Sequence, residues 1–244
     1  MKGDVLLRVD GLAKRFGGVQ AVADLSFEVR EGEILGMIGP NGSGKTTTFN
    51  LITGFYRPDR GRARFAGQDI TALPPHAVCA RGICRTFQVA KPFRELTVLR
   101  NVLMGALLRH PNTAEAEARA GEVLHAVGLE GRAHMEAGSL TTIDQRRLEV
   151  ARALATEPQL VLLDETMAGL NPTEIGEAMR LIAGLRERGL TVVVVEHVMR
   201  AVMSLSDRIV VLDQGAKIAE GTPREVAADP RVIRAYLGAE YRRA

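Results

Sequence analysis

The chain has 244 residues, of which 46% are hydrophobic and 25% are charged, and these proportions exclude an intrinsically disordered protein. Its formal net charge of +3 comes from basic residues spread along the sequence without long runs of like charge, so composition gives little support to nucleic-acid binding. The length suits one large α/β domain or two small ones.

The two cysteines and the N-terminal segment indicate the cellular compartment. Cys79 and Cys84 form neither a disulfide framework nor a metal-binding motif, and we expect reduced thiols in a reducing compartment. The first residues lack the apolar stretch and cleavage site of a signal peptide. No window approaches the run of about 18 apolar residues that a membrane-spanning helix needs. These features predict a cytosolic chain that relies on partners for any work at a membrane.

The first part of the chain predicts strands around one glycine-rich loop. Residues 4–10 and 22–30 are expected to be strands. The short apolar run 34–39 is typical of a strand buried on both faces. A helix is expected over residues 45–53, and Gly54 would end it in a C-cap position.

The rest of the chain predicts a helical insertion followed by more strands. Residues 95–154 carry helical signals and no buried-strand run, whereas 159–164 and 190–196 are two such runs, each followed by helical sequence. Residues 207–221 predict a hairpin, and the tail from Thr222 predicts two short helices. Repeated strand–helix alternation indicates an α/β fold with a mostly parallel sheet.

The glycine-rich loop fits a phosphate-binding pattern, G-x-x-x-x-G-K-[ST], between a buried strand and a helix. Its glycines allow backbone N–H groups to converge on one anion at a helix N-terminus. Lys45 would place a charge on the β- and γ-phosphates, and the Thr46 hydroxyl can bind Mg²⁺. The loop therefore predicts nucleoside triphosphate binding, by Gly39, Asn41, Gly42, Ser43, Gly44, Lys45 and Thr46.

Three further side chains are predicted to lie at the carboxyl ends of buried strands. Asp164 and Glu165 follow the run 159–164, and such positions face the crevice in which these folds bind ligands. Asp164 could hold Mg²⁺ through its water shell, and Glu165 could polarise a water that attacks the γ-phosphate. His197 follows the run 190–196 and is expected to reach the same crevice.

Two other residues are candidates by position. Gln88 lies where the strand-like segment 83–87 leads into the helical insertion, from which it could reach Mg²⁺ and its water. Phe16 precedes two glycines and could stack on a base, an interaction worth about 1–3 kcal/mol. Ordinary packing in the core is the alternative for Phe16.

In this order the motifs resemble those of the ATP-binding-cassette (ABC) ATPases, and the resemblance covers essentially the whole chain. It implies a P-loop NTPase fold with a mostly parallel sheet, an antiparallel β subdomain and a helical insertion. The chain would be one ABC ATPase domain, comprising a RecA-like core with antiparallel β (1–90 and 158–221), a helical subdomain (91–157) and a C-terminal extension (222–244).

The resemblance also implies roles for individual residues, with ATP and Mg²⁺ as cofactors. In such proteins two subunits sandwich two ATP molecules, and each site is completed by the signature peptide of the other subunit. The resemblance implies that Lys45, Thr46 and Thr47 bind phosphates and Mg²⁺, and that Gln88 is the Q-loop glutamine. It further implies that Asp164 and Glu165 are the Walker B pair, that residues 168–171 are the D-loop and that His197 is the switch histidine.

The signature peptide is where this sequence departs from the family. The pattern LSGGQ falls on the signature segment, residues 140–144, which reads Leu-Thr-Thr-Ile-Asp. Thr141 keeps a hydroxyl for the γ-phosphate and Thr142 follows it, but Ile143 replaces a glycine whose bare N–H approaches the phosphate. Asp144 is expected to repel a polyphosphate, although the helix dipole remains favourable. We expect a sound Walker half, a weak signature half, and pairing with a different ATPase that has an intact signature.

Several segments resemble one subfamily, the ATPase subunits of branched-chain (hydrophobic) amino-acid importers. They are residues 85–88, 92–107, 145–154, 168–174 and the distinctive tail 220–238. The resemblance implies two permeases docking near residues 88–100, a second ATPase, an extracytoplasmic binding protein and no nucleic acid. It also implies a peripheral position on the cytoplasmic face of the inner membrane.

Other classes remain as alternatives. Urea importers and lipopolysaccharide-export ATPases have similar tails, and a soluble regulatory cassette would bind ATP with little turnover. A soluble cassette acting on DNA or ribosomes usually has large insertions or two cassettes in one chain, for which this length leaves no room. A P-loop GTPase would need an N-K-x-D motif, which is absent from the sequence.

Overall fold

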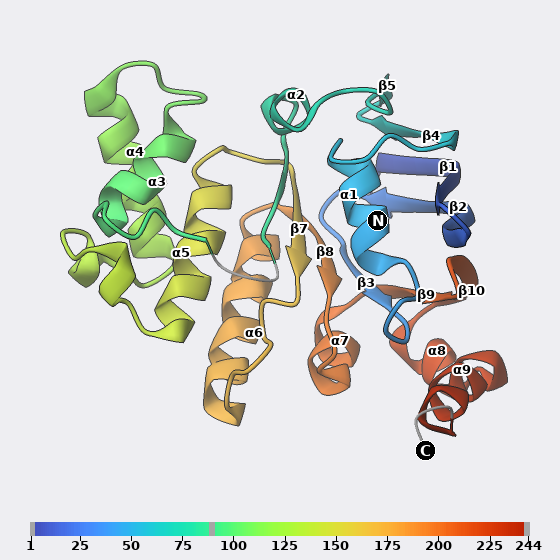
Figure 1. Ribbon diagram of the computed structural model, residues 1–244. Helices are drawn as coiled ribbons and strands as arrows, with labels where there is room; N and C mark the ends of the chain where they lie inside the picture. Colours follow the sequence, from blue (N-terminus) through green and yellow to red (C-terminus); the bar gives the residue numbers. More distant parts are fainter. Residues whose placement is uncertain (1–2, 88–90, 242–244) are drawn as a thin grey trace.

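The computed structural model describes residues 3–87 and 91–241 of the protein (Figure 1). Within these residues the strands form a four-stranded sheet, in the order β2-β1-β4-β5, and a six-stranded sheet, in the order β10-β9-β3-β8-β7-β6. The first is antiparallel, and all neighbouring pairs in the second are parallel except β9 and β10. The expected α/β fold, with a mostly parallel sheet and an antiparallel β region, is confirmed.

The antiparallel sheet is more extensive than the sequence predicts. Its first two strands were expected at 4–10 and 22–30, but both extend to a tight turn at Gly17. Irregular register near Gly11 interrupts the alternation of buried and exposed residues, which hides the length of the first strand. The strands are β1 (Val5–Phe16), β2 (Val19–Arg30), β4 (Arg60–Phe65) and β5 (Gln68–Asp69).

The six-stranded sheet contains the three apolar runs that the sequence identifies as buried strands. Every residue of β3, β7 and β8 is buried. The predicted hairpin turn lies at Gln214 and Gly215, both in the left-handed region with φ of 47° and 83°, as a two-residue hairpin turn requires. The strands are β3 (Ile34–Ile38), β6 (Ile83–Arg85), β7 (Leu160–Asp164), β8 (Thr191–Val195), β9 (Arg208–Asp213) and β10 (Ala216–Gly221).

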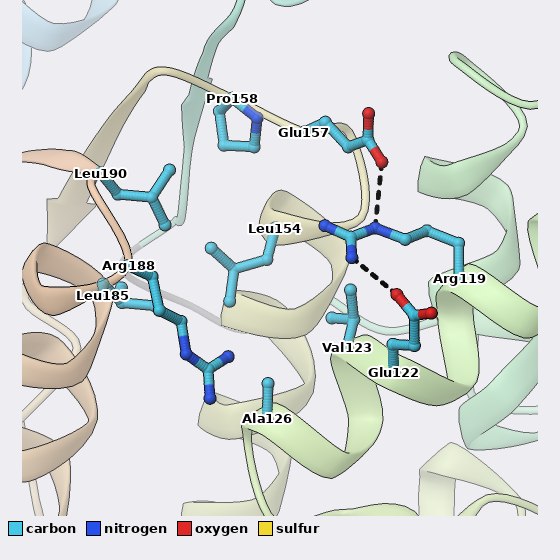
Figure 2. A pocket seen from close by; sticks show the side chains of 10 residues that line it. All are labelled: Arg119, Glu122, Val123, Ala126, Leu154, Glu157, Pro158, Leu185, Arg188 and Leu190. Atoms are coloured by element: carbon cyan, nitrogen blue, oxygen red, sulfur yellow. Dashed lines mark hydrogen bonds and ion pairs between the residues drawn. The ribbon is translucent and has the colours of Figure 1, made fainter.

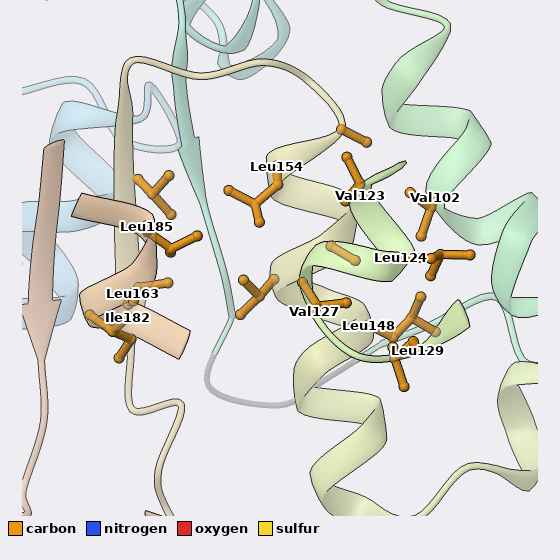
Figure 3. Close-up of a cluster of buried hydrophobic side chains, with 14 of the residues drawn as sticks. Val102, Val123, Leu124, Val127, Leu129, Leu148, Leu154, Leu163, Ile182 and Leu185 are labelled. Carbon is orange, nitrogen blue, oxygen red and sulfur yellow. The ribbon is translucent and has the colours of Figure 1, made fainter. Parts of the chain in front are cut away.

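The segment between β6 and β7 is helical, as expected. Its described helices are α3 (Val98–Ala106), α4 (Thr113–Ala126) and α5 (Thr142–Leu154). Aliphatic side chains from these helices form one buried cluster with Leu163 on β7 and with Ile182 and Leu185 on α6 (Pro172–Glu187) (Figure 3). The helical region therefore shares a core with one face of the parallel sheet.

A hollow of about 240 Å³ marks the seam between α4 and the end of α6 (Figure 2). Its apolar floor includes Leu154 and Leu185. Across its rim, Arg119 pairs with Glu122 at 2.8 Å and with Glu157 at 3.0 Å. The ion pair with Glu157 thus links α4 to the residues just after α5 within the helical region, and the apolar floor brings this region against the end of α6.

The remaining helices cover the other surfaces of the sheets. The first of them, α1 (Lys45–Ile52), buries Phe49 in the cluster shared by the two sheets. Thr222 caps α8 (Pro223–Ala228) as predicted, and α9 (Pro230–Tyr241) follows. The others are α2 (Pro75–Ala80) and α7 (Met199–Leu205). Within the described ranges, no helix is long and apolar enough to cross a bilayer. Cys79 and Cys84 are free thiols, as expected.

Candidate active site

The phosphate loop, residues 39–46, connects β3 to α1 and depends on glycine at its two ends. A Cβ on Gly39 would lie 2.1 Å from the Leu212 carbonyl oxygen, and one on Gly44 would lie 2.4 Å from that of Ala21. Gly44 is also in the left-handed region, with φ of 103°. No other residue fits these two positions, so the loop has the glycines that a backbone anion site needs.

Lys45 begins α1 and holds its ammonium group over the phosphate loop. The side chain is 5% exposed, and Nζ donates to the carbonyl oxygens of Gly39 at 2.8 Å and Pro40 at 3.0 Å. Burial lowers the pKa of Lys45, while the carboxylates of Glu165 and Asp164 oppose that shift. The predicted phosphate-binding cation is therefore close to both predicted Walker B carboxylates.

Asp164 ends β7 beside a partner that the sequence does not predict. Its Oδ2 accepts from Nη2 of Arg85 at 2.8 Å, and the two side chains are 1% and 6% exposed. Burial raises the pKa of Asp164, and Arg85 opposes that shift. Its Oδ1 is buried and has no hydrogen-bond partner among the described residues. One feature of the sequence could have indicated a functional role for Arg85, because it is a charged residue in a short strand close to the predicted Gln88.

Glu165 and His197, predicted from separate strands, lie in direct contact. His197 Nε2 is 2.5 Å from Glu165 Oε1. Glu165 occupies the left-handed region with φ of 51°, a conformation that costs about 1–3 kcal/mol in a non-glycine residue. Its N–H donates to the Val195 carbonyl oxygen at 2.9 Å. The Glu165 carboxylate, on a strained backbone, and the exposed His197 imidazole thus lie together at one edge of the sheet.

A second carboxylate, that of Glu196, fixes the backbone on either side of this contact. Glu196 is 2% exposed, and its Oε1 accepts from the Met167 N–H at 2.7 Å and from the Thr166 hydroxyl at 3.2 Å. Burial raises the pKa of Glu196. These bonds tie the end of β8 to the turn after β7, which positions His197 and Glu165 relative to each other.

Phe16 is not a core residue, because its side chain is 42% exposed at the end of β1. It makes an edge-to-face contact with Tyr56, with ring centroids 5.1 Å apart. Lys14 Nζ lies 5.6 Å from the centroid of the Phe16 ring. Phe16 is therefore not buried in the core, although it packs against Tyr56, an aromatic neighbour that the sequence does not predict.

Gln88 lies outside the described residues, but Phe87 before it and Lys91 after it in the sequence line a groove. This docking groove is a cavity of about 790 Å³, and Thr46, Asp164, Phe93 and Met104 are also among the residues that line it. Phe87 and Phe93 are 42% and 49% exposed. Residues predicted to bind the nucleotide and part of the predicted docking surface, residues 88–100, therefore share one cavity.

The signature segment spans the N-terminus of α5, with Thr141 as N-cap and Asp144 in the first turn, and does not line that cavity. Thr141 caps α5, since its Oγ1 accepts from the Asp144 N–H at 3.3 Å and donates to Asp144 Oδ2 at 2.6 Å. Thr142 is exposed and Ile143 is half-buried. Asp144 is 2% exposed and lies 2.7 Å from Arg132 and 3.6 Å from Arg147.

The expectation that Asp144 presents a repelling charge is wrong. The carboxylate is turned into the protein, where two guanidinium groups and the Thr141 hydroxyl compensate it. The sequence could not reveal this, because Arg132 reaches Asp144 from a separate 3₁₀ turn, Glu130–Arg132. The difference from the family pattern that still predicts weaker phosphate binding is Ile143, which stands where the pattern has a glycine.

Comparisons with known proteins match this architecture. A family model described as ABC transporter matches residues 22–168, and one described as branched-chain amino acid ATP-binding cassette transporter matches residues 216–242. The high-affinity branched-chain amino acid transport ATP-binding protein BraF of Pseudomonas aeruginosa is 45% identical, over 96% of this chain and 98% of its own. The corresponding protein LivG of Escherichia coli K12 is 44% identical over the same shares.

A more distant relative and a solved structure extend the comparison. The lipopolysaccharide export system ATP-binding protein LptB of E. coli K12 is 39% identical over 97% of this chain and 98% of its own. The crystal structure of the ADP conformation of MJ1267, an ATP-binding cassette of an ABC transporter, superposes with a TM-score of 0.88 at 33% identity, over 96% of this chain and 99% of that one.

Proposed function

The chain belongs to the ABC transporter family and is an ABC-type ATPase, and from this premise we propose that it powers an importer of branched-chain or other hydrophobic amino acids. The observation that carries the proposal is similarity along the whole chain to BraF and LivG, at 45% and 44% identity. The separate match of residues 216–242 to a branched-chain cassette model supports it. The lipopolysaccharide-export alternative is less favoured, because LptB is 39% identical.

Binding of the ATP phosphates is assigned to the phosphate loop. The uncapped N–H groups at the start of α1 and the Lys45 ammonium group would contact the phosphates. In the structure Lys45 donates to two loop carbonyl oxygens, so a bound phosphate would replace them as its partner. Phe16, with Tyr56 against its edge, is proposed to stack on the adenine.

The residues present also fit a Mg²⁺ ion. Mg²⁺ is usually held by one or two protein oxygen ligands together with waters and substrate phosphates. Thr46 and Asp164 line the same cavity, and Asp164 Oδ1 is a buried oxygen without a partner among the described residues. We assign Mg²⁺ to Thr46, Asp164 and, by resemblance, Gln88. The bound ion would neutralise charge on the phosphates.

Hydrolysis is assigned to Glu165 and His197. Glu165 would accept a proton from the attacking water. His197 contacts Glu165 at 2.5 Å and would hold that carboxylate in place, in addition to its expected contact with the γ-phosphate. The strained backbone of Glu165 supports a functional rather than a structural role, since such strain concentrates at active sites.

The second ATP site is proposed to be weaker. In a dimer of ABC ATPases, Thr141, Thr142 and Ile143 would face the nucleotide of the other subunit. Thr141 already uses its hydroxyl as a helix cap, and Ile143 stands where the family pattern has glycine. We therefore propose that the partner subunit is a second ATPase with an intact signature.

The docking groove is proposed to receive a permease. Its exposed aromatic residues, Phe87 and Phe93, suit an apolar helix that projects from a membrane subunit. Two permeases would then hold this peripheral subunit at the cytoplasmic face of the membrane. An external binding protein would deliver the substrate. In this proposal residues 91–157 form the helical subdomain that carries one wall of the groove.

Reconstitution tests the proposal. The chain, a candidate second ATPase and two candidate permeases from the same organism would be placed in liposomes with the binding protein. Labelled leucine is expected to enter only with ATP on the side of the ATPases, and Glu165→Gln is expected to abolish uptake while ATP binding persists. Uptake of urea instead of leucine, or no coupling of ATP hydrolysis to these permeases, would overturn the substrate assignment.

A further inference from the structure

Arg85 contacts two residues that line the docking groove, Asp164 and Phe87. All three nitrogen positions of its guanidinium are occupied. Nη2 donates to Asp164 Oδ2 at 2.8 Å, Nη1 to Asn50 Oδ1 at 2.6 Å, and Nε to the Thr86 carbonyl oxygen at 3.3 Å. The bonds to Asn50 and Thr86 fix the planar guanidinium, which in turn orients Asp164. Asp164 can therefore turn only if its bond from Arg85 Nη2 breaks.

The face of the same guanidinium lies against aromatic rings. Its central carbon is 4.9 Å from the centroid of Phe87 and 5.8 Å from those of Phe49 and Phe55. Phe55 and Phe87 are both exposed, and of the two Phe87 lines the groove. The Phe87 N–H donates to Glu149 Oε1 at 3.3 Å. A helix that displaces the Phe87 ring would consequently disturb the guanidinium that holds Asp164.

The pairing leaves one specific oxygen available. Arg85 occupies Oδ2 of Asp164, and the Asp164 N–H donates to the Thr86 hydroxyl at 3.2 Å. Oδ1 is then the buried carboxylate oxygen without a described partner, in a cavity that Thr46 also lines. The side chain is thus oriented before any metal or nucleotide arrives.

We propose that Arg85 is a positioning residue that holds Asp164 with Oδ1 presented to the metal ion of the bound nucleotide, and that Phe87 passes displacement by a docked helix to this carboxylate. The proposal rests on the proposed function, because it assumes that Asp164 serves a nucleotide-bound metal. It adds a residue that links the docking groove to the metal site through two contacts.

The test measures metal binding without turnover. Mn²⁺ serves as a paramagnetic probe, and its affinity for the full-length chain with a non-hydrolysable ATP analogue is read by electron paramagnetic resonance. A fluorescent ATP analogue in EDTA reports nucleotide affinity without metal. Arg85→Lys keeps the charge but loses the fork. It is expected to weaken Mn²⁺ binding about 10- to 100-fold, the range for loss of a residue that orients a metal ligand, with metal-free nucleotide affinity kept within about twofold.

Matched variants separate positioning from general stability. Arg81→Lys alters an arginine just before β6 whose Nε donates to the exposed Gln68 side chain at 3.2 Å, and is expected to leave both affinities unchanged. Phe87→Ala is expected to weaken Mn²⁺ binding. Phe93→Ala removes another exposed groove aromatic that lies against Arg152, at 5.0 Å, and is expected to have no such effect.

Three outcomes would count against these ideas in different ways. Unchanged Mn²⁺ affinity in Arg85→Lys would overturn the positioning role. Equal loss of metal-free nucleotide binding in that variant would show that Arg85 serves the fold alone. Equal effects of Phe87→Ala and Phe93→Ala would remove the link to docking. If the wild-type chain bound neither the analogue nor Mn²⁺, the proposed function itself would fail.

Discussion

The phosphate loop and the signature segment each contain the start of a helix, of α1 and of α5, and the two helix N-termini differ in their capping. Gly44 is the N-cap of α1 and has no side chain to occupy the first N–H groups. Thr141 is the N-cap of α5 and accepts from the Asp144 N–H. A helix start without a cap leaves donors for an anion, whereas a capped one has already satisfied part of them.

The charged residues at the two helix starts also differ. The first turn of α1 has no acidic residue and begins with Lys45, while that of α5 contains Asp144. Asp144 is buried and pairs with two partly exposed arginines, Arg132 and Arg147. The comparison teaches that the signature segment of this chain is organised for stability of α5, whereas the phosphate loop remains open toward a ligand.

The largest effect is expected from Glu165→Gln, in the ATP site that contains the phosphate loop. We expect ATP turnover to fall by about 10²–10⁴-fold, because a general base is lost, while ATP binding is retained. Steady-state hydrolysis and equilibrium nucleotide binding measure the two properties. Glu187→Gln, at the exposed end of α6, is the control and should keep wild-type turnover. Unchanged hydrolysis in Glu165→Gln would remove the catalytic role of this residue.

The comparison would be broken by restoring one glycine to the signature segment. Ile143→Gly exposes a backbone N–H to the phosphate of a facing subunit, and a hydrogen bond to a charged group is worth about 1.5–3 kcal/mol. We expect hydrolysis by a dimer of this chain to rise by about 10- to 100-fold, in line with that energy. Asp144→Gln alone should bring no increase, because its carboxylate faces inward. A rise with Asp144→Gln but not with Ile143→Gly would reverse this conclusion.

The stabilising role of Asp144 gives a smaller effect of a different kind. Asp144→Asn removes the charge-assisted hydrogen bond from Arg132, whereas Arg147 keeps its ion pair with Glu177. The free energy of unfolding should therefore fall by about 1.5–3 kcal/mol. Urea denaturation followed by circular dichroism measures this loss. Thr142→Ala, at an exposed neighbour, should be nearly neutral. Equal stability of Asp144→Asn and the wild type would show that the ion pairs of Asp144 contribute nothing to α5.

The smallest effect concerns Glu149, also on α5. Burial raises its pKa, against the opposing bond from the Phe87 N–H. The folded state therefore binds a proton more readily than the unfolded state, and this group costs stability as pH rises through its folded pKa. Glu149→Gln should be more stable than the wild type at neutral pH, and the difference should vanish below about pH 4, the ordinary range for glutamate.

Denaturation curves at several pH values would check the Glu149 prediction. Glu136→Gln, which changes an exposed glutamate before the signature segment, is the matched control and should show no pH-dependent gain. A variant Glu149→Gln that is equally destabilised at every pH would mean that the carboxylate is needed to hold Phe87 and is not a cost to the fold.

The features that the sequence predicted are those that depend on neighbours in the chain. Short apolar runs indicated β3, β7 and β8, and the glycine spacing indicated the phosphate loop, because each pattern is local. The Arg85–Asp164 pair escaped prediction, since it requires that β6 lie beside β7. The burial of Asp144 escaped for the same reason, and the arginine-rich β4 does not have the composition of a strand.

The contacts between the phosphate loop and the hairpin β9–β10 have a consequence for the order of folding. The Gly215 N–H donates to the Ser43 carbonyl oxygen at 3.1 Å, and the Gly215 carbonyl oxygen accepts from the Ala23 N–H at 2.8 Å. Gly39 also packs against Leu212. On the ribosome, the early loop therefore has to wait for a late hairpin before it takes its final shape. A chain truncated before β9 carries every phosphate-binding residue and still lacks the support that makes them a site.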